Sequence, residues 1–280
     1  MTGRRIARLV RARRTARVAL VAAAFAGTAA HADQPLWELG LGAAALRIPQ
    51  YRGSDESRGW LLPLPYFVYR GAILRSDREG TRAVLVDAKR FDLDLSLSLS
   101  PPASSSGNDA RKGMPDLKAT FGLGPNVNAT LARGAHWKLQ LRLPLRGVWT
   151  VESSPRWLGW NFNPVLNLDL QAAGWNFGVH GGPQWAARRY DAYFYGVPSA
   201  YATASRPAYD APGGGAGWGA GASASRRLGD WWLGAYLHAD ALGGASFESS
   251  PLVRSRHNLS VGLAASWIFK TSDGRVPDSR

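Results

Sequence analysis

The feature that most constrains this chain is a strict alternation of apolar and polar residues, repeated in stretches of about ten residues. In RFDLDLSLSLSPP, the odd positions of residues 91–100 are all Phe or Leu, and the even positions are all Asp or Ser. Successive side chains of a β-strand point to opposite faces, so the pattern predicts strands with two chemically opposite faces. It recurs over residues 137–146, 160–171 and 259–269, where no helical period competes with it.

Alternation alone is compatible with two environments. A soluble β-sandwich turns its apolar faces to a core, whereas a membrane barrel turns them to lipid and its polar faces to a wet lumen. Soluble domains usually cover their surface with Lys and Glu, and this chain of 280 residues has 5 of each. The solvated faces of a sandwich would here be Asn, Ser, Gly and Arg, which favours the barrel.

Strand length and aromatic placement also favour the barrel. About ten residues at roughly 3.3 Å each, tilted by about 40°, span roughly 25 Å, the height of the apolar band of an outer-membrane barrel. Trp and Tyr at the ends of the segments are typical of the two membrane interfaces. These residues are Trp37, Tyr66, Tyr69, Trp137, Trp149, Trp157, Trp160, Trp175, Trp231, Trp232 and Trp267.

The sequence therefore predicts an all-β fold, a transmembrane antiparallel up-and-down β-barrel of twelve strands over residues 33–269. The expected strands are 35–47, 59–70, 72–78, 82–88, 91–100, 116–132, 135–149, 158–172, 174–190, 213–228, 231–245 and 257–269. Short and long links alternate between them, and an even strand count places both ends in the periplasm. The main outer loop is expected at 191–212. If residues 72–88 form one irregular excursion, the barrel has ten strands.

Residues 1–32 fit a secretory signal peptide. Seven Arg and no acidic residue precede a thirteen-residue apolar run at Val18–Ala30, which is too short to span a bilayer as a helix. The sequence Ala-His-Ala then supplies Ala30 and Ala32 as the small residues of a cleavage site before Asp33. The mature chain is thus expected to be exported.

The net charge of +14 does not indicate a nucleic-acid partner. Beyond residue 32 the chain has 27 basic and 20 acidic residues, a net charge of +7 that is spread along the sequence rather than clustered. The absence of Cys excludes disulfides, thiolate metal sites and a Cys nucleophile.

Candidate catalytic chemistry is sparse. His238 and Asp240 share one strand face, and Ser246 and Ser260 lie in the same region, so a Ser-His-Asp hydrolase is a distant alternative to a lumen-facing His. No His spacing predicts zinc. The Gly-rich residues 212–225 lack the Lys-Ser/Thr of a phosphate loop and fit glycine in a curved strand. We therefore expect no enzyme, no cofactor and no metal.

The polar faces of the strands are expected to line the lumen. Unpaired charges there are costly, so they should pair or line water, which fits both a plug and a narrow pore. The residues expected to face the lumen are Asp92, Asp94, Lys138, Arg142, Arg146, Asn163, Asn167 and Asp169.

Two stretches of the chain, 49–71 and 193–269, contain recognisable loop motifs. The residues that carry them are Tyr51, Gly53, Ser54, Pro63, Pro65, Tyr66 and Tyr69 in the first, and Arg206, Pro207, Ala208, Tyr209, Ser250, Pro251, Leu252 and Val253 in the second. With these motifs the chain resembles the MipA/OmpV family of Gram-negative outer-membrane proteins.

The resemblance implies a barrel in the cell outer membrane, in contact with its lipid and lipopolysaccharide. The family name implies a non-enzymatic scaffold that connects a murein transglycosylase with a murein synthase. Other members of the family are porin-like or adhesive, so a small-solute channel with a charged lumen is the alternative function.

A scaffold needs a surface for its partners, and a stable interface buries roughly 800 Å² on each side. Periplasmic turns of about two residues offer little of this area. Residues 270–280 form a polar tail beyond Phe269 and are expected to be disordered alone. We therefore expect periplasmic contacts at this tail and at two turns, through Lys89, Arg90, Arg133, Lys270 and Arg275.

Overall fold

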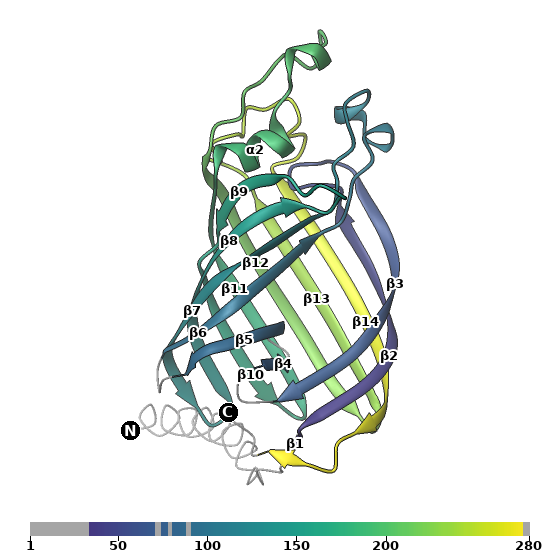
Figure 1. The fold of residues 1–280 in the computed structure, drawn as a ribbon, viewed down its shortest axis with the longest axis vertical. Helices are drawn as coiled ribbons and strands as arrows, with labels where there is room; N and C mark the ends of the chain where they lie inside the picture. Colours follow the sequence, from purple (N-terminus) through teal and green to yellow (C-terminus); the bar gives the residue numbers. More distant parts are fainter. Residues whose placement is uncertain (1–33, 71–73, 78–79, 88–90, 277–280) are drawn as a thin grey trace, which may run out of the picture. The chain divides into compact units, whose positions relative to one another are not determined.

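The structure is a computed structural model that describes residues 34–70, 74–77, 80–87 and 91–276 in two compact units. The larger unit, Pro35–Asp273, is almost entirely one antiparallel sheet (Figure 1). Of the other unit, the structure describes Gln34 and residues 274–276. A separate two-stranded sheet pairs β1 (Gln34–Pro35) with β15 (Arg275–Val276).

The large sheet consists of strands that follow one another in chain order. They are β2 (Trp37–Pro49), β3 (Ser57–Arg70), β4 (Leu74–Asp77), β5 (Gly80–Asp87), β6 (Phe91–Ser100), β7 (Thr120–Gly134), β8 (Trp137–Thr150), β9 (Trp157–Phe162), β10 (Val165–Ala172), β11 (Trp175–Ala186), β12 (Gly214–Leu228), β13 (Trp231–Ala241) and β14 (His257–Thr271). Consecutive strands pair in the antiparallel sense, except that β9 does not pair with β10, and β14 also pairs with β2. Pairing of β10 with β8 closes the sheet into a barrel.

The predicted up-and-down barrel is thereby confirmed. β9 and β10 act as one interrupted strand, because both pair with β8 and β11 and only Asn163 and Pro164 separate them. If they are counted as one strand, the sheet of described residues has twelve strands. Residues 72–88, on which the choice between twelve and ten strands depends, contain the 4-residue strand β4 and gaps in the described chain.

The two faces of the sheet differ as the alternation predicts. Apolar side chains such as Leu97, Leu99, Val179 and Leu237 are exposed on the outside. Many of the intervening positions on the inside are polar or small and buried, whereas others, such as Leu62 and Tyr236, are large and apolar or aromatic. An exposed apolar belt around a closed sheet is the form that a lipid environment requires.

The structure corrects the predicted strand at 174–190. β11 ends at Ala186, and residues 188–195 form helix α2 (Arg188–Tyr195). The alternation stops at Arg188, and Tyr190 and Phe194 follow at helical spacing, with ring centroids 5.0 Å apart. None of the helices in the described part of the chain has the length and apolar character needed to cross a membrane.

Other loops contain short helical turns instead of the longer strands that we expected. β13 ends at Ala241 rather than at residue 245, and β14 continues beyond Phe269 to Thr271. Single turns of 3-10 helix lie at η1 (Ser105–Gly107), η2 (Asp109–Arg111) and η3 (Ser199–Tyr201).

Two adjacent positions of β13 test which face meets lipid. Leu237 is paired with Val261 on the outside, and Tyr236 is paired with Gly262 on the inside. We expect Leu237→Arg to impair assembly by about 2–4 kcal/mol, because Arg on the lipid face near the midplane costs this much. Tyr236→Arg should cost far less, since the lumen is wet. Heat-modifiable migration in SDS gels after refolding into liposomes measures the folded fraction, and equal losses would contradict the assignment.

Candidate functional site

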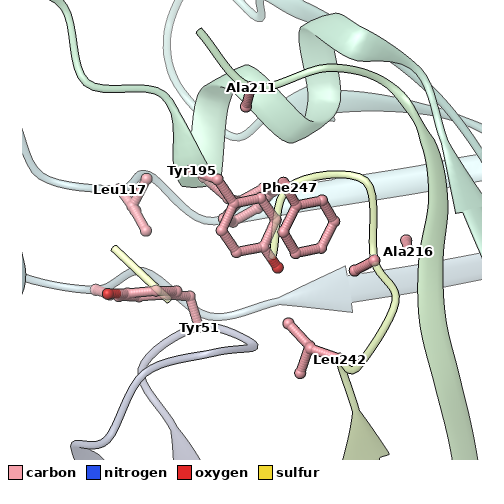
Figure 2. Packing of buried hydrophobic residues seen from close by; sticks show 10 residues of the cluster. Tyr51, Leu117, Tyr195, Ala211, Ala216, Leu242 and Phe247 are labelled. Carbon is pink, nitrogen blue, oxygen red and sulfur yellow. The ribbon is translucent and has the colours of Figure 1, made fainter. Parts of the chain in front are cut away.

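The loops at one end of the barrel pack into a hydrophobic cluster of their own, which we call the outer cap (Figure 2). Its buried members are Tyr51, Ala103, Leu117, Phe194, Tyr195, Ala211, Ala216, Leu242, Ala245 and Phe247. The rings of Tyr195 and Phe247 stack with centroids 3.7 Å apart, and the surface of Phe247 is 0% exposed. Burial of this kind holds the loops in one arrangement.

Three motif residues of the first stretch, Tyr51, Gly53 and Ser54, make hydrogen bonds that stabilise the cap. The Tyr51 hydroxyl donates a hydrogen bond to the Leu252 carbonyl, 201 residues away, at 2.8 Å. The Asn258 side chain accepts from the Gly53 N–H at 2.5 Å and donates to the Ser54 carbonyl at 2.7 Å. Gly53 has a φ of +93°, a conformation that favours glycine. These bonds join the loop after β2 to the loop before β14 and to the first residues of β14.

Two buried arginines bind backbone carbonyls of the cap. Arg206, from the second motif stretch, donates to the carbonyls of Ala110, Lys112 and Tyr201. Arg111 donates to the Phe194 carbonyl at 3.0 Å. Ser250, also a motif residue, donates to the Tyr195 carbonyl at 2.6 Å. Buried carbonyls outside regular structure need such donors, so these residues hold the loops together.

One ion pair joins the cap to the barrel wall. The Arg52 Nε donates to Asp240 Oδ1 at 2.8 Å, and its Nη2 donates to the Ala216 carbonyl at 2.8 Å. Asp240 is buried on the inner face of β13, where Gln184 Nε2 also lies 3.4 Å from its Oδ1.

The residues considered for a hydrolase do not form a catalytic triad. His238 Nε2 lies 3.4 Å from Asp240 Oδ1, but within the described residues neither Ser246 nor Ser260 is hydrogen-bonded to His238, so the contact between base and nucleophile is not formed. Ser260 lies opposite His238 in the β13–β14 ladder, whereas Ser246 donates to the Pro212 carbonyl at 3.3 Å. Within the described residues, no group of three His, Asp or Glu side chains is arranged to hold a metal ion.

The structure places Asp92 and Asp94 in an amide network between β6 and β7. Asp94 is buried and accepts hydrogen bonds from Asn126 at 3.0 Å and from Asn128 at 2.9 Å. Asn128 also donates to Asp92 at 2.5 Å. Amide donors thus compensate for the burial of these carboxylates.

A second network lies between β8 and β10. Arg142 Nη2 is 3.4 Å from Asp169 Oδ2 and donates to Gln140 at 3.0 Å. Asn167 donates to the same Asp169 oxygen at 2.8 Å. Lys138 lies opposite Asp169 in the β8–β10 register. The predicted residues of these two strands therefore come together.

Two further predicted residues lie apart from these networks. Arg146 reaches the Ser96 hydroxyl with its Nε at 2.9 Å and its Nη2 at 2.6 Å. Asn163 lies in the break between β9 and β10, and its buried Oδ1 has no hydrogen-bond partner among the described residues. Its backbone N–H donates to the Pro144 carbonyl at 3.4 Å.

Sequence analysis missed a buried carboxylate near the start of β2. Glu38 accepts hydrogen bonds from Arg70 at 2.8 Å and from Arg227 at 2.6 Å, and the Tyr66 hydroxyl lies 3.5 Å away. An acid among the apolar and small residues of WELGLGAAAL was the available signal. Its partners lie 32 and 189 residues further on, so spacing alone could not identify them.

The other predicted sites lie in or near the turns and the chain ends. Ala30, Ala32, Asp33, Lys89 and Arg90 lie outside the described residues. Arg133 is exposed at the end of β7. Lys270 is exposed and belongs to β14, where its Nζ lies 6.0 Å from the centre of the Trp37 ring. Arg275 is exposed in β15.

The outer cap also contains a carboxylate without a hydrogen-bond partner. Asp191 of α2 has 0% of its surface exposed, and neither carboxylate oxygen is bonded to any described residue. Burial raises the pKa of Asp191 from its ordinary value of 3.8 to about 7, and nearby Arg52 opposes part of this rise.

Several solved structures are similar to this chain. An outer membrane channel from Pseudomonas putida F1 matches with 12% identity and a TM-score of 0.42, over 87% of this chain and 99% of that one. The NanC porin matches with 7% identity and a TM-score of 0.36, over 83% and 98%. Outer membrane phospholipase A from Escherichia coli matches with 10% identity and a TM-score of 0.34, over 84% and 94%. No curated protein matches the sequence.

A closed antiparallel sheet with an apolar outside and polar networks inside defines the class of outer-membrane β-barrels. The sequence profile of the family described as MltA-interacting protein MipA matches residues 41–269. The chain belongs to this family, and its location is the outer membrane.

The raised pKa of Asp191 predicts that the cap loosens as pH rises. Between about pH 4 and pH 7, Asp191 is protonated in the closed cap and ionised in an opened cap. The free energy of opening the cap therefore falls by about 1.4 kcal/mol for each pH unit in this range. Asp191→Asn cannot ionise and should remove this dependence. Hydrogen exchange of the α2 amides at about pH 5 and about pH 8, corrected for intrinsic rates, measures the effect.

Asp210→Asn is the matched control for this experiment. Asp210 is exposed and forms an ion pair with Arg188, the first residue of α2. Its replacement should therefore leave the pH dependence of α2 exchange intact. If exchange in the Asp191→Asn protein changes with pH as in the unaltered protein, Asp191 does not control the cap.

Proposed function

We propose that this outer-membrane barrel is a non-enzymatic scaffold that holds murein-remodelling enzymes at the membrane. The family description names an interaction with MltA, and a murein transglycosylase is the partner that we expect on this basis. A murein synthase is the second expected partner.

The outer cap is the observation that carries this proposal. Side chains from several loops pack together there at one end of the barrel, and Phe247, Leu242 and Ala211 among them have no exposed surface. An open pore would need that end to be clear, whereas a scaffold needs only a rigid body in the membrane. The cap is also where the motif residues of the family are concentrated.

The short turns at the opposite end are the proposed docking face. Arg133 and Lys270 are exposed there at the ends of β7 and β14. Such rim charges contribute to partner choice and to the rate of association more than to buried area.

Charge reversal at the turn end tests the scaffold. Arg133→Glu with Lys270→Glu should lower the lytic transglycosylase activity that co-purifies from solubilised envelopes by about tenfold. The control reverses two exposed charges at the cap end, Arg189→Glu with Arg254→Glu, and should leave recovery unchanged. Equal recovery from both double variants would contradict docking at the turns.

A small-solute channel is the second candidate. Two inward-facing charged side chains keep water contact, with exposures of 36% for Asp169 and 39% for Arg227. Water-accessible charges inside a barrel are what a selective channel uses.

Planar-bilayer recordings distinguish the two candidates. If the cap is the barrier, the unaltered protein should be silent and Phe247→Ala should produce discrete conductance steps. Ser249→Ala, beside the cap, is the control and should stay silent. Steady conductance of the unaltered protein, with selectivity changed by Arg142→Glu, would favour the channel over the scaffold.

A further inference from the structure

Two strands of the barrel have edges that no described strand covers. β3 pairs with β4 only at Tyr69 and Arg70, although it pairs with β2 along its whole length. β6 pairs with β5 only over Asp92–Asp94. Residues 57–66 of β3 and 95–100 of β6 therefore border an interruption of the wall, which we call the seam. In Figure 1, β3 and β6 diverge from the β4–β5 hairpin toward the loops, and the far strands β13 and β14 are seen between them.

The sequence of β3 fits an uncovered edge. The Arg70 N–H points to β2, where it donates to the Leu36 carbonyl. Since the register with β2 is continuous, even-numbered N–H groups face β2 and odd-numbered ones face the seam. Pro63 and Pro65 are odd-numbered, so the two residues without an N–H lie on the seam edge. An unbonded N–H in hydrocarbon is costly, and proline removes it.

The inner wall on the β3 side of the seam is apolar. Leu62 pairs with buried Ala44 on the inside of the barrel, yet 40% of its surface is exposed. Trp60 and Leu46 form the neighbouring inward-facing pair. The β6 side of the seam carries Ser96, Ser98 and Ser100 at its inward positions and belongs to the polar wall of β6 to β10, so the apolar surface is confined to the β3 side.

A cavity connects the two sides of the seam at its loop end. Its volume is about 220 Å³, and it is lined by Ile48, Arg58 and Trp60 from one side and by Pro101, Pro102 and Ala103 from the other. The Arg58 guanidinium lies 4.6 Å from the centre of the Trp60 ring. Among the ion pairs of the described residues, none includes Arg58, so its charge is available to a ligand.

We propose that the seam is a lateral portal through which an acyl chain of an anionic lipid of the surrounding membrane reaches the inner wall. The chain lies along Trp60 and Leu62, and the phosphate of the headgroup binds Arg58. Exposed Leu61 and Leu99 border the seam from outside and place it in the lipid-facing belt. A partner β-strand is disfavoured as occupant, because Pro63 and Pro65 cannot donate to it.

Adjacent leucines provide an internal reference for a test. Leu61 faces lipid with 77% exposure, and Leu62 faces the lumen. The full-length protein is reconstituted with phosphatidylglycerol that carries a diazirine on one acyl chain, irradiated, and mapped by mass spectrometry. Leu61 should be labelled by any surrounding lipid. The portal predicts additional adducts on Leu62 and Trp60.

The headgroup is tested with a second lipid and a variant. Phosphatidylcholine with the same labelled chain should give about fivefold fewer adducts on Leu62, as expected for one Arg at an anionic lipid. Arg58→Gln should abolish this difference and leave Leu61 adducts and heat-modifiable migration unchanged. Adducts restricted to Leu61, Leu97 and Leu99, or equal Leu62 yields from both lipids in the unaltered protein, would overturn the proposal.

Discussion

Backbone hydrogen bonding in hydrocarbon is the constraint on which the rest of this structure depends. Lipid offers no partner for an N–H or C=O group, so the strands must satisfy one another around a closed sheet. The pairing of β14 with β2 and of β8 with β10 achieves this closure, except along the seam between β3 and β6. Closure then assigns every second side chain to lipid and the others to the interior, which is why the alternation in the sequence is so regular.

The loops lie outside the closed sheet and are held together by a hydrophobic core of their own, the outer cap. The outer cap packs aromatic side chains above the barrel, and its polar groups bind loop carbonyls that no strand can reach. The Arg52–Asp240 pair connects this core to the wall. Asp191 is the exception in the cap, since a buried carboxylate without a donor favours its protonated form.

The alternating strands could be predicted from the sequence because their signal is local. Residues 91–100, for example, were predicted as a strand and form β6 with the same bounds. The cap could not be predicted, since Tyr51 and Leu252 are brought together only by the closed barrel. The Glu38 network was missed for the same reason, because Glu38 lies in β2 and its partner Arg227 lies in β12, far along the chain. Helix α2 was missed because its period begins where the strand pattern stops.

The cap and the seam together determine how the interior can be reached. At the loop end, side chains from several loops pack into the buried cluster of the outer cap. The proposed portal lies instead in the wall, where β3 carries Trp60 and Leu62 on its inner face. The lipid access that we propose through the wall and the protein docking that we propose at the short turns use different surfaces. One barrel can therefore serve both without a conflict between its occupants.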